Sequence, residues 1–302
     1  MGKDHILERI HDFVEPYKIT SGKNFKLSDI DPGDTGPLTS EKKTQAKELL
    51  QKGIEYLAEM QDMLYAQDNW AMLLIFQAMD AAGKDGTIKH VMSGVNPQGC
   101  QVYSFKPPSE EELDHDWMWR YQRCVPERGR IGIFNRSYYE EVLVVRVHKQ
   151  VLAKQKMPPS LVTKNIWEER LSDMACFEQY LARNGVVVLK FFLHVSKKEQ
   201  KKRFLERLSL PEKHWKFSPA DVLDRKFWDD YMEAYQDAIA STASKQAPWF
   251  VVPADNKWFT RLVVAGAIVE TMAKLDLAYP TVDKKRMQEL AAAGAQLMRS
   301  KD

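Results

Sequence analysis

The sequence has little of what marks several large classes of protein. Its three cysteines are scattered without C-x-x-C spacing, which fits a reducing compartment and gives no metal or redox signature. No apolar run reaches the ~18 residues that a membrane span needs, and the N-terminus has no apolar secretory region. We therefore expect a cytoplasmic chain that does not enter a membrane.

An excess of charge of one sign is also missing. Lys and Arg total 44 against 42 for Asp and Glu, a balance that argues against a dedicated DNA- or RNA-binding protein. The seven histidines lack metal-ligand spacing. The sequence also offers no Ser-His-Asp or Cys-His arrangement for nucleophilic catalysis. Any site for a polyanion must therefore be local.

What the chain does have, after Trp70, is an alternation of apolar runs and helix-like stretches. The runs cover residues 71–76, 101–105, 131–134, 186–195 and 249–252. This alternation predicts an α/β fold with three layers, in which helices cover both faces of a parallel sheet. Three helix starts are indicated by N-cap arrangements at Ser109 with Glu112, Ser196 with Glu199, and Ser218 with Pro219 and Asp221.

Three parts can be distinguished along the chain. Residues 1–67 form a helical arm expected to pack on the core, with a long helix from near Ser40 that Thr39 or Ser40 would cap. Residues 68–280 form the core, and residues 281–302 form a C-terminal helix. Within the core, residues from about 197 to 230 are expected to act as a lid.

The segment Asp80–Thr87, with the sequence D-A-A-G-K-D-G-T, is the most informative motif. Its small residues let backbone N–H groups face an oxyanion beside the positive end of the following helix, and Lys84 adds a mobile positive charge. The expected phosphate-binding residues are Ala81, Ala82, Gly83, Asp85, Gly86 and Thr87. Ala78 and Asp85 stand where G-x-x-x-x-G-K-[ST] has Gly and Ser or Thr, so an ordinary turn stays an alternative.

A second polar motif, Asn135-Arg136-Ser137, ends the run at 131–134. The guanidinium of Arg136 suits bidentate contact with phosphate. Asparagine lacks the negative charge that an acid would bring to Mg²⁺ at this place. Metal binding would then rest on Asp80, with Asp85 as a second candidate, and on phosphate oxygens. A capped strand-to-helix turn is the simpler alternative.

Basic residues gather between Lys197 and Lys216, where Lys and Arg outnumber Asp and Glu by eight to three. Arg203 and Arg207 lie one helical turn apart, so both can project from the same helix. As a lid over bound phosphates, this helix would exclude water and limit hydrolysis. A solvated helix face is the alternative.

Taken together, these motifs resemble the polyphosphate kinase 2 family. The resemblance rests on residues 80–89, on F-N-R-S-Y-Y-E at 134–140, on K-R-F-L-E-R at 202–207 with P-E-K-H-W-K-F at 211–217, and on P-A-D-N-K-W at 253–258. It implies a thymidylate-kinase-like P-loop kinase with a helical lid, dependent on Mg²⁺ with Mn²⁺ as an alternative. It also implies a dimer or tetramer that transfers phosphate from polyphosphate to nucleotides.

Site roles carry over by the same resemblance. Asp80 is similar to the acid that helps to hold Mg²⁺ or the reacting phosphates, Lys84 to the lysine that neutralises them, and Asn135 with Arg136 to the second-loop pair. The residues expected along the polyphosphate path are Arg203 and Arg207 and, on weaker grounds, Lys213 and Lys216.

Two departures from the common family pattern point to its class III branch. Many members have Asp-Arg-Ser where this chain has Asn135-Arg136-Ser137, and Gly-Lys-Gly where it has Gly83-Lys84-Asp85. The implied activity is reversible conversion of AMP to ADP and of ADP to ATP by polyphosphate. An ATP-dependent nucleotide or nucleoside kinase of the same fold is one alternative, and a non-catalytic switch that binds nucleotide or polyphosphate is another.

Overall fold

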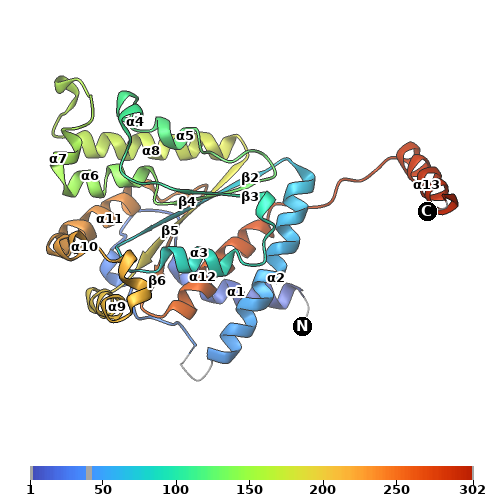
Figure 1. Cartoon of the computed structure of the whole chain (residues 1–302), viewed down its shortest axis with the longest axis horizontal. Helices are drawn as coiled ribbons and strands as arrows, with labels where there is room; N and C mark the ends of the chain where they lie inside the picture. Colours follow the sequence, from blue (N-terminus) through green and yellow to red (C-terminus); the bar gives the residue numbers. More distant parts are fainter. Residues whose placement is uncertain (1–2, 39–42, 301–302) are drawn as a thin grey trace.

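A six-stranded sheet forms the middle of three layers (Figure 1). The computed structural model describes residues 3–38 and 43–300. The strands are β1 (Lys18–Ile19), β2 (Ala71–Ala78), β3 (Cys100–Ser104), β4 (Ile131–Asn135), β5 (Val186–His194) and β6 (Trp249–Pro253). They pair in the order β1-β6-β5-β2-β4-β3, and every pair is parallel except β1 with β6. The predicted α/β fold is therefore confirmed, and each expected apolar run forms a strand.

Helices cover both faces of this sheet (Figure 1). On one face α12 (Lys257–Met272) packs against α1 (Lys3–Val14), α2 (Lys43–Gln67) and α3 (Lys84–Val91). On the other face α11 (Trp228–Thr242) packs against α8 (Ile166–Arg183) and α6 (Val144–Val147). The remaining helices are α4 (Glu110–Asp114), α5 (Trp119–Gln122), α7 (Lys149–Leu152), α9 (Lys197–Ser209), α10 (Pro219–Asp224) and α13 (Lys284–Arg299). No helix in these described ranges is both long and apolar enough to span a bilayer.

The central strand β2 and helix α12 are buried and consist largely of apolar residues. Seven of the eight residues of β2 are buried, as expected for a central parallel strand covered on both faces. Helix α12 is apolar on nearly all sides because it lies between the sheet and α1 with α2. Gly266 allows α1 to approach closely, since a Cβ at this position would come within 2.9 Å of Ile10 and Val14.

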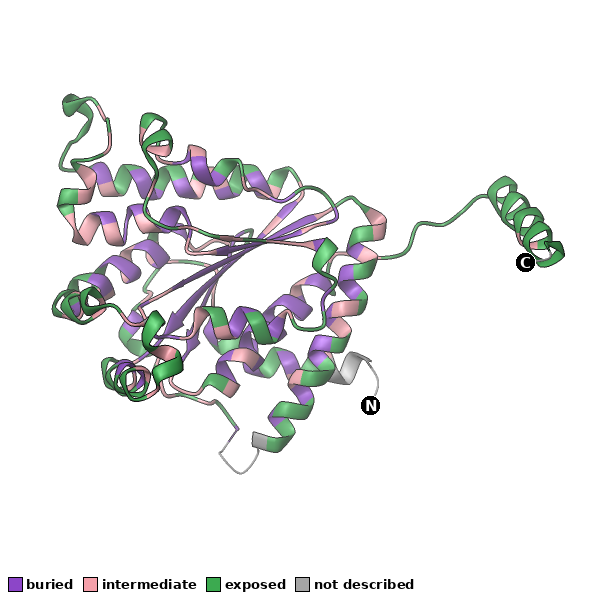
Figure 2. Ribbon diagram, viewed as in Figure 1, coloured by how far each residue is buried: buried purple, intermediate pink, exposed green. Residues whose placement is uncertain are grey.

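The N-terminal part of the chain packs on this core, whereas the C-terminal helix does not. The apolar side of α2 is buried, and its described part begins at Lys43; the expected caps Thr39 and Ser40 lie outside the described residues. Helix α13 forms where a C-terminal helix was predicted, but it stands away from the body (Figures 1 and 2). Its apolar side chains Met287, Leu290 and Leu297 are all exposed.

The predicted helix starts are confirmed in detail. Ser109 and Glu112 form a reciprocal capping box at α4. Ser196 accepts from the backbone N–H of Glu199 at the start of α9, and Ser218 caps α10 with Pro219 in the first turn. Two-residue β1 was not predicted, because so short an edge strand has no periodicity to detect.

Candidate active site

Polar residues meet at the carboxyl edge of the parallel strands. Asp80 follows β2, Asn135 ends β4, Ser196 follows β5 and Asp255 follows β6. Because neighbouring parallel strands end on the same side of a sheet, these four positions converge at one edge. The oxygens of Asp255 accept from the backbone N–H (2.8 Å) and hydroxyl (2.7 Å) of Ser196, which links the last two of these strand ends.

The loop between β2 and α3 has the geometry of a phosphate cradle. Ala81 and Gly83 adopt left-handed conformations, with φ of 61° and 107°. Gly83 is the N-cap of α3 and offers no side chain to its first turn. The first-turn N–H groups and the helix dipole are therefore directed at the loop. Gly86 lies in the first turn of α3, and Thr87 is buried in that helix.

Lys84 lies at the centre of this loop. Its Nζ donates to the carbonyl of Ala78 at 2.7 Å. Burial lowers the pKa of Lys84, although Asp80 opposes this shift and Arg136 adds to it. Both groups therefore lie near enough to Lys84 for their charges to act on it. The structure thus brings together the lysine, the acid and the arginine predicted to act on phosphate.

Arg136 is held by its backbone as well as by its charge. It has a φ of 67°, and its N–H donates to the carbonyl of Phe76 in β2 at 3.0 Å. Its Nη2 lies 3.5 Å from Asp80 Oδ1. Burial lowers the pKa of Arg136, but the charges of Glu140 and Asp80 outweigh burial and raise it overall. A non-glycine residue held in this backbone region is typical of sites built for function.

The two positions that depart from the common family pattern lie against each other. Asn135 Nδ2 donates to Asp85 Oδ1 at 2.8 Å. An aspartate in place of Asn135 would instead set one carboxylate against another at this distance. The amide at 135 and the carboxylate at 85 are therefore a matched pair, which neither position reveals alone.

A buried polar network behind the second loop was missed in the sequence. The side chain of Lys190, in the middle of β5, pairs with Glu178 of α8, and both are fully buried. Glu178 Oε1 also accepts from the hydroxyls of Tyr138 (2.9 Å) and Tyr139 (2.8 Å). This network fixes the 3-10 turn Tyr138–Glu141 directly after Arg136. A lysine within an otherwise apolar strand was the only signal for it.

Other neighbours of the site were also not predicted. Gln77 Nε2 donates to Glu140 at 2.9 Å, which places a second acid near Arg136. On α10, burial and the charge of Asp80 raise the pKa of the Asp221 carboxyl. On α11, burial and the charges of Glu140 and Asp80 raise the pKa of Tyr235. Groups of the second loop, α10 and α11 therefore contribute to the electrostatics of the candidate site.

Helix α9 lies over the loop but does not present both arginines in the same way. Arg203 is only 5% exposed, and its guanidinium donates to backbone carbonyls of the loop. The side chain is therefore engaged within the protein, and its expected place along a polyphosphate path stays a prediction. Arg207, one turn later, is half-buried with its guanidinium 5.7 Å from the ring centroid of Phe204.

The other two basic residues expected along the path follow α9. Lys213 lies in the 3-10 segment η7 (Pro211–Lys216), and its Nζ is 2.6 Å from Glu206. Lys216 ends the same segment, and its side chain is outside the described part of the structure. We call residues 209–224, which comprise η7 and α10, the outer segment.

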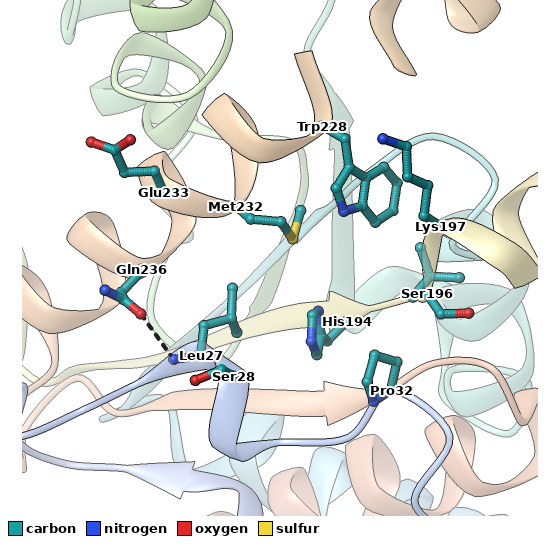
Figure 3. Close-up of a pocket in the computed structure, with 11 residues that line it drawn as sticks. Leu27, Ser28, Pro32, His194, Ser196, Lys197, Trp228, Met232, Glu233 and Gln236 are labelled. Atoms are coloured by element: carbon teal, nitrogen blue, oxygen red, sulfur yellow. Dashed lines mark hydrogen bonds between the residues drawn. The ribbon is translucent and has the colours of Figure 1, made fainter. Parts of the chain in front are cut away.

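Two cavities lie near residues of the candidate site. One of about 500 Å³ lies between the N-terminal segment, the end of β5 and α11, where His194 stands between Pro32 and Trp228 (Figure 3). The other, of about 360 Å³, is lined by residues that include Arg120 and Glu141. Neither cavity includes Asp80, Lys84 or Arg136. The site is therefore defined by its charged groups and backbone rather than by the more apolar hollows beside it.

Among the described residues, no group of three His, Cys, Asp or Glu side chains with metal-ligand spacing lies at the loop. Within residues 3–38 and 43–300, the one cluster of three potential ligands comprises His11, Glu15 and Glu270, on the N-terminal side of the molecule. Asp80 is about a third exposed beside Arg136 and offers carboxylate oxygens, the donor type that Mg²⁺ prefers. The donors therefore fit a cation that takes most of its ligands from phosphate and water, as Mg²⁺ commonly does.

Comparison with known proteins supports this interpretation. Residues 39–279 match the family described as Polyphosphate kinase 2. The chain is 49% identical over 284 residues to the ADP-polyphosphate phosphotransferase of Rhodopseudomonas palustris, covering 92% of this chain and 98% of that protein. It is 43% identical over 267 residues to the AMP/ADP-polyphosphate phosphotransferase of Meiothermus ruber, covering 88% of this chain and 96% of the relative.

The fold has a solved counterpart as well. The crystal structure of Polyphosphate Kinase 2 from Arthrobacter aurescens TC1 superposes with a TM-score of 0.85 at 38% sequence identity. The match covers 95% of this chain and 96% of that one. The two folds are therefore alike over nearly the whole chain.

Proposed function

The chain belongs to the polyphosphate kinase 2 family, and we propose that it transfers the terminal phosphate of inorganic polyphosphate to both AMP and ADP. As a member of this family it is a phosphotransferase. The observation that carries the proposal is the convergence of Lys84, Asp80 and Arg136 on one glycine-containing loop. Phosphoryl transfer needs alignment and charge neutralisation more than covalent help from the protein.

The reaction exchanges one phosphorus–oxygen bond for another. A phosphate oxygen of AMP or ADP attacks the terminal phosphorus of polyphosphate, and the bridging oxygen leaves with a chain that is one unit shorter. Negative charge spreads over the transferred group during this step. In this proposal Lys84 and Arg136 would neutralise that charge, and the backbone N–H groups in the first turn of α3 would hold the phosphate oxygens. The N–H groups of Ala82 and Thr87 already donate to the carbonyls of Met79 and Gly83.

A metal ion completes the charge balance. The family is metal-dependent, and we propose Mg²⁺, with Mn²⁺ as a substitute, held by Asp80 and by phosphate oxygens. When bound, the ion would neutralise phosphate oxygens that Lys84 and Arg136 do not reach. Asn135 keeps Asp85 in place through its amide and adds no charge to the metal site.

Acceptance of both AMP and ADP is proposed from two observations. The relative from Meiothermus ruber is named for both nucleotides. The Asn135–Asp85 pair also gives this chain the two departures that the class III resemblance rests on. The polyphosphate chain would extend along Arg207, Lys213 and Lys216 at the border of the outer segment, where positive charge continues beyond the loop.

A donor-by-acceptor assay tests the proposal. Purified protein with Mg²⁺ is incubated with AMP or ADP and either polyphosphate or ATP, and nucleotides are separated by chromatography. We expect AMP with polyphosphate to yield ADP first and ATP later. Lys84→Ala protein serves as the inactive control.

Each alternative outcome has a distinct meaning. Turnover with ATP as donor but none with polyphosphate would identify an ATP-dependent nucleotide kinase. Binding of polyphosphate without any turnover, at several pH values and with both metals, would identify a non-catalytic binding module. Conversion of ADP but not AMP would leave the donor assignment intact and reject the dual acceptor range.

A further inference from the structure

Arg203 uses its whole guanidinium on the protein itself. A guanidinium has five N–H donors, and five acceptors are in place. Nε donates to Glu199 Oε1 (3.0 Å), Nη1 to the carbonyls of Ala81 (3.1 Å) and Ala82 (2.7 Å), and Nη2 to those of Ala254 (2.6 Å) and Asp255 (3.0 Å). A side chain with this set of partners has no donor left for a phosphate oxygen.

Two of the four carbonyls that Arg203 binds, those of Ala81 and Ala82, belong to the phosphate loop in its strained conformation. Ala81 has a φ of 61°, a region that is unfavourable for a non-glycine residue and persists only where the surroundings enforce it. In a trans peptide the carbonyl of one residue points opposite to the N–H of the next, so the Ala82 carbonyl that binds Arg203 directs the Gly83 N–H away from the guanidinium. Buried carbonyls need donors, and Arg203 supplies them to Ala81 and Ala82.

The same side chain joins two strand ends that do not pair with each other. Ala81 and Ala82 follow β2, whereas Ala254 and Asp255 follow β6, and β5 lies between these strands. One turn earlier on α9, Gln200 Nε2 donates to the carbonyl of Asp80 at 3.0 Å. The first half of α9 is therefore attached to the loop rather than suspended above it.

We propose that Arg203 is a positioning residue that holds the phosphate loop in its binding conformation, and that it is not a ligand of the polyphosphate chain. The effect on rate rests on the function proposed above; the effect on loop structure does not. Lysine cannot replace the arginine, because one ammonium group has three donors at a single point and cannot reach carbonyls on two sides.

The experiment compares three variants of the full-length protein. Arg203→Lys keeps the charge and Arg203→Met removes it. Lys201→Met is the matched control, because Lys201 is an exposed residue of the same helix. Amide hydrogen exchange of peptides covering residues 79–87 reports on the loop without requiring turnover. Steady-state kinetics with polyphosphate and AMP reports kcat and KM separately.

We expect faster exchange of the loop amides in both Arg203 variants and parent-like exchange in Lys201→Met. A loop displaced by about 1 Å can lose ~100-fold in rate, so we expect kcat of Arg203→Lys to fall by a factor of that order. KM for polyphosphate should stay within about threefold, since no contact with the substrate is removed. Glu199→Ala, which removes one acceptor of five, should give a smaller loss and covers the case in which Arg203→Met fails to fold.

Opposite results would overturn the inference. If Arg203→Lys keeps parental kcat and parental loop exchange while KM for polyphosphate rises, Arg203 contacts the substrate. Unchanged loop exchange in every Arg203 variant would also reject the positioning role. If the parent protein shows no polyphosphate turnover, the proposed function fails, yet the exchange data still decide whether Arg203 holds the loop.

Discussion

The two sides of the candidate site differ in what their charged groups bind. On the loop side, Lys84 and Arg203 donate to backbone carbonyls whose positions are fixed by the ends of strands. On the outer segment, Lys213 meets the side chain of Glu206, and both groups are substantially exposed. A cation on a fixed carbonyl is in place before substrate arrives, whereas an exposed ion pair contributes little and exchanges readily with solvent.

The loop side and the outer segment also differ in how far their residues are buried. The loop follows β2, in which seven of eight residues are buried, while the outer segment leaves Trp215 79% exposed and Leu223 57% exposed. Segments with few buried apolar contacts open at low free-energy cost. The comparison suggests that one side of the site is preorganised for phosphate and the other is able to close over it. Mutations on the two sides should therefore separate kcat from KM.

The largest effect should come from the centre of the rigid side. In the proposed mechanism Lys84→Ala would remove the charge that neutralises the transferred phosphate, and loss of such an electrostatic contact typically costs ~10²–10³ in kcat. We expect kcat with polyphosphate and AMP to fall by about 10³-fold. Circular dichroism and thermal melting should match the parent protein. A kcat within tenfold of the parent would contradict a central role for this lysine.

The Asn135–Asp85 pair provides the next largest effect. Asn135→Asp would set two carboxylates in contact, and like charges at this distance should lower both stability and kcat, the latter about tenfold. In the double variant Asn135→Asp/Asp85→Asn the amide and carboxylate exchange places, so the hydrogen bond can form again. A double-mutant cycle on the free energy of unfolding should give a coupling of about 1–3 kcal/mol. Additive effects would show that the two positions act independently.

Much of the fold could be predicted, because its signals are local. The apolar runs that form β2 to β6 and the small residues around Gly83 each indicate the local structure from only a few neighbouring residues. The short edge strand β1 escapes such an analysis, since its two residues are defined only by pairing with β6. The exposure of α13 escaped it too, because an apolar stripe predicts a buried face and does not say whether a partner is present.

The sequence predicted which residues meet at the candidate site but not which hydrogen-bond partners they have. Lys84, Asp80 and Arg136 converge as expected because parallel strands end at one edge. Arg203 and Arg207 look equivalent in the sequence, with one turn between them, yet Arg203 finds four carbonyls from distant segments. The pairing of Lys190 with Glu178 likewise joins residues on different elements. Charge and spacing are local properties, whereas hydrogen-bond partners depend on the tertiary fold.

A pH profile tests the rigid side further. Burial lowers the pKa of Lys84 below the ordinary lysine value of 10.5. As the pH rises, Lys84 therefore loses its proton earlier than an ordinary lysine, and the phosphate loses its neutralising charge. We expect kcat/KM, which reports groups of the free enzyme, to decline on an alkaline limb with a midpoint below 10.5, by about tenfold for each pH unit beyond it. Thermal melting at each pH controls for unfolding. A kcat/KM that stays constant up to pH 10.5 would contradict this shift.

The smallest effect should lie at the border of the outer segment. Arg207→Met removes a positive charge from the proposed polyphosphate path, and we expect KM for polyphosphate to rise about threefold to tenfold with kcat changed less than twofold. Stability should fall by less than ~1 kcal/mol, as is usual for a partly exposed charge. Set beside Arg203→Met, the variant should show the opposite pattern: a raised KM with parental exchange of residues 79–87. If Arg207→Met instead lowers kcat and speeds loop exchange, both arginines belong to the rigid side, and the boundary between the two regions lies further along the chain.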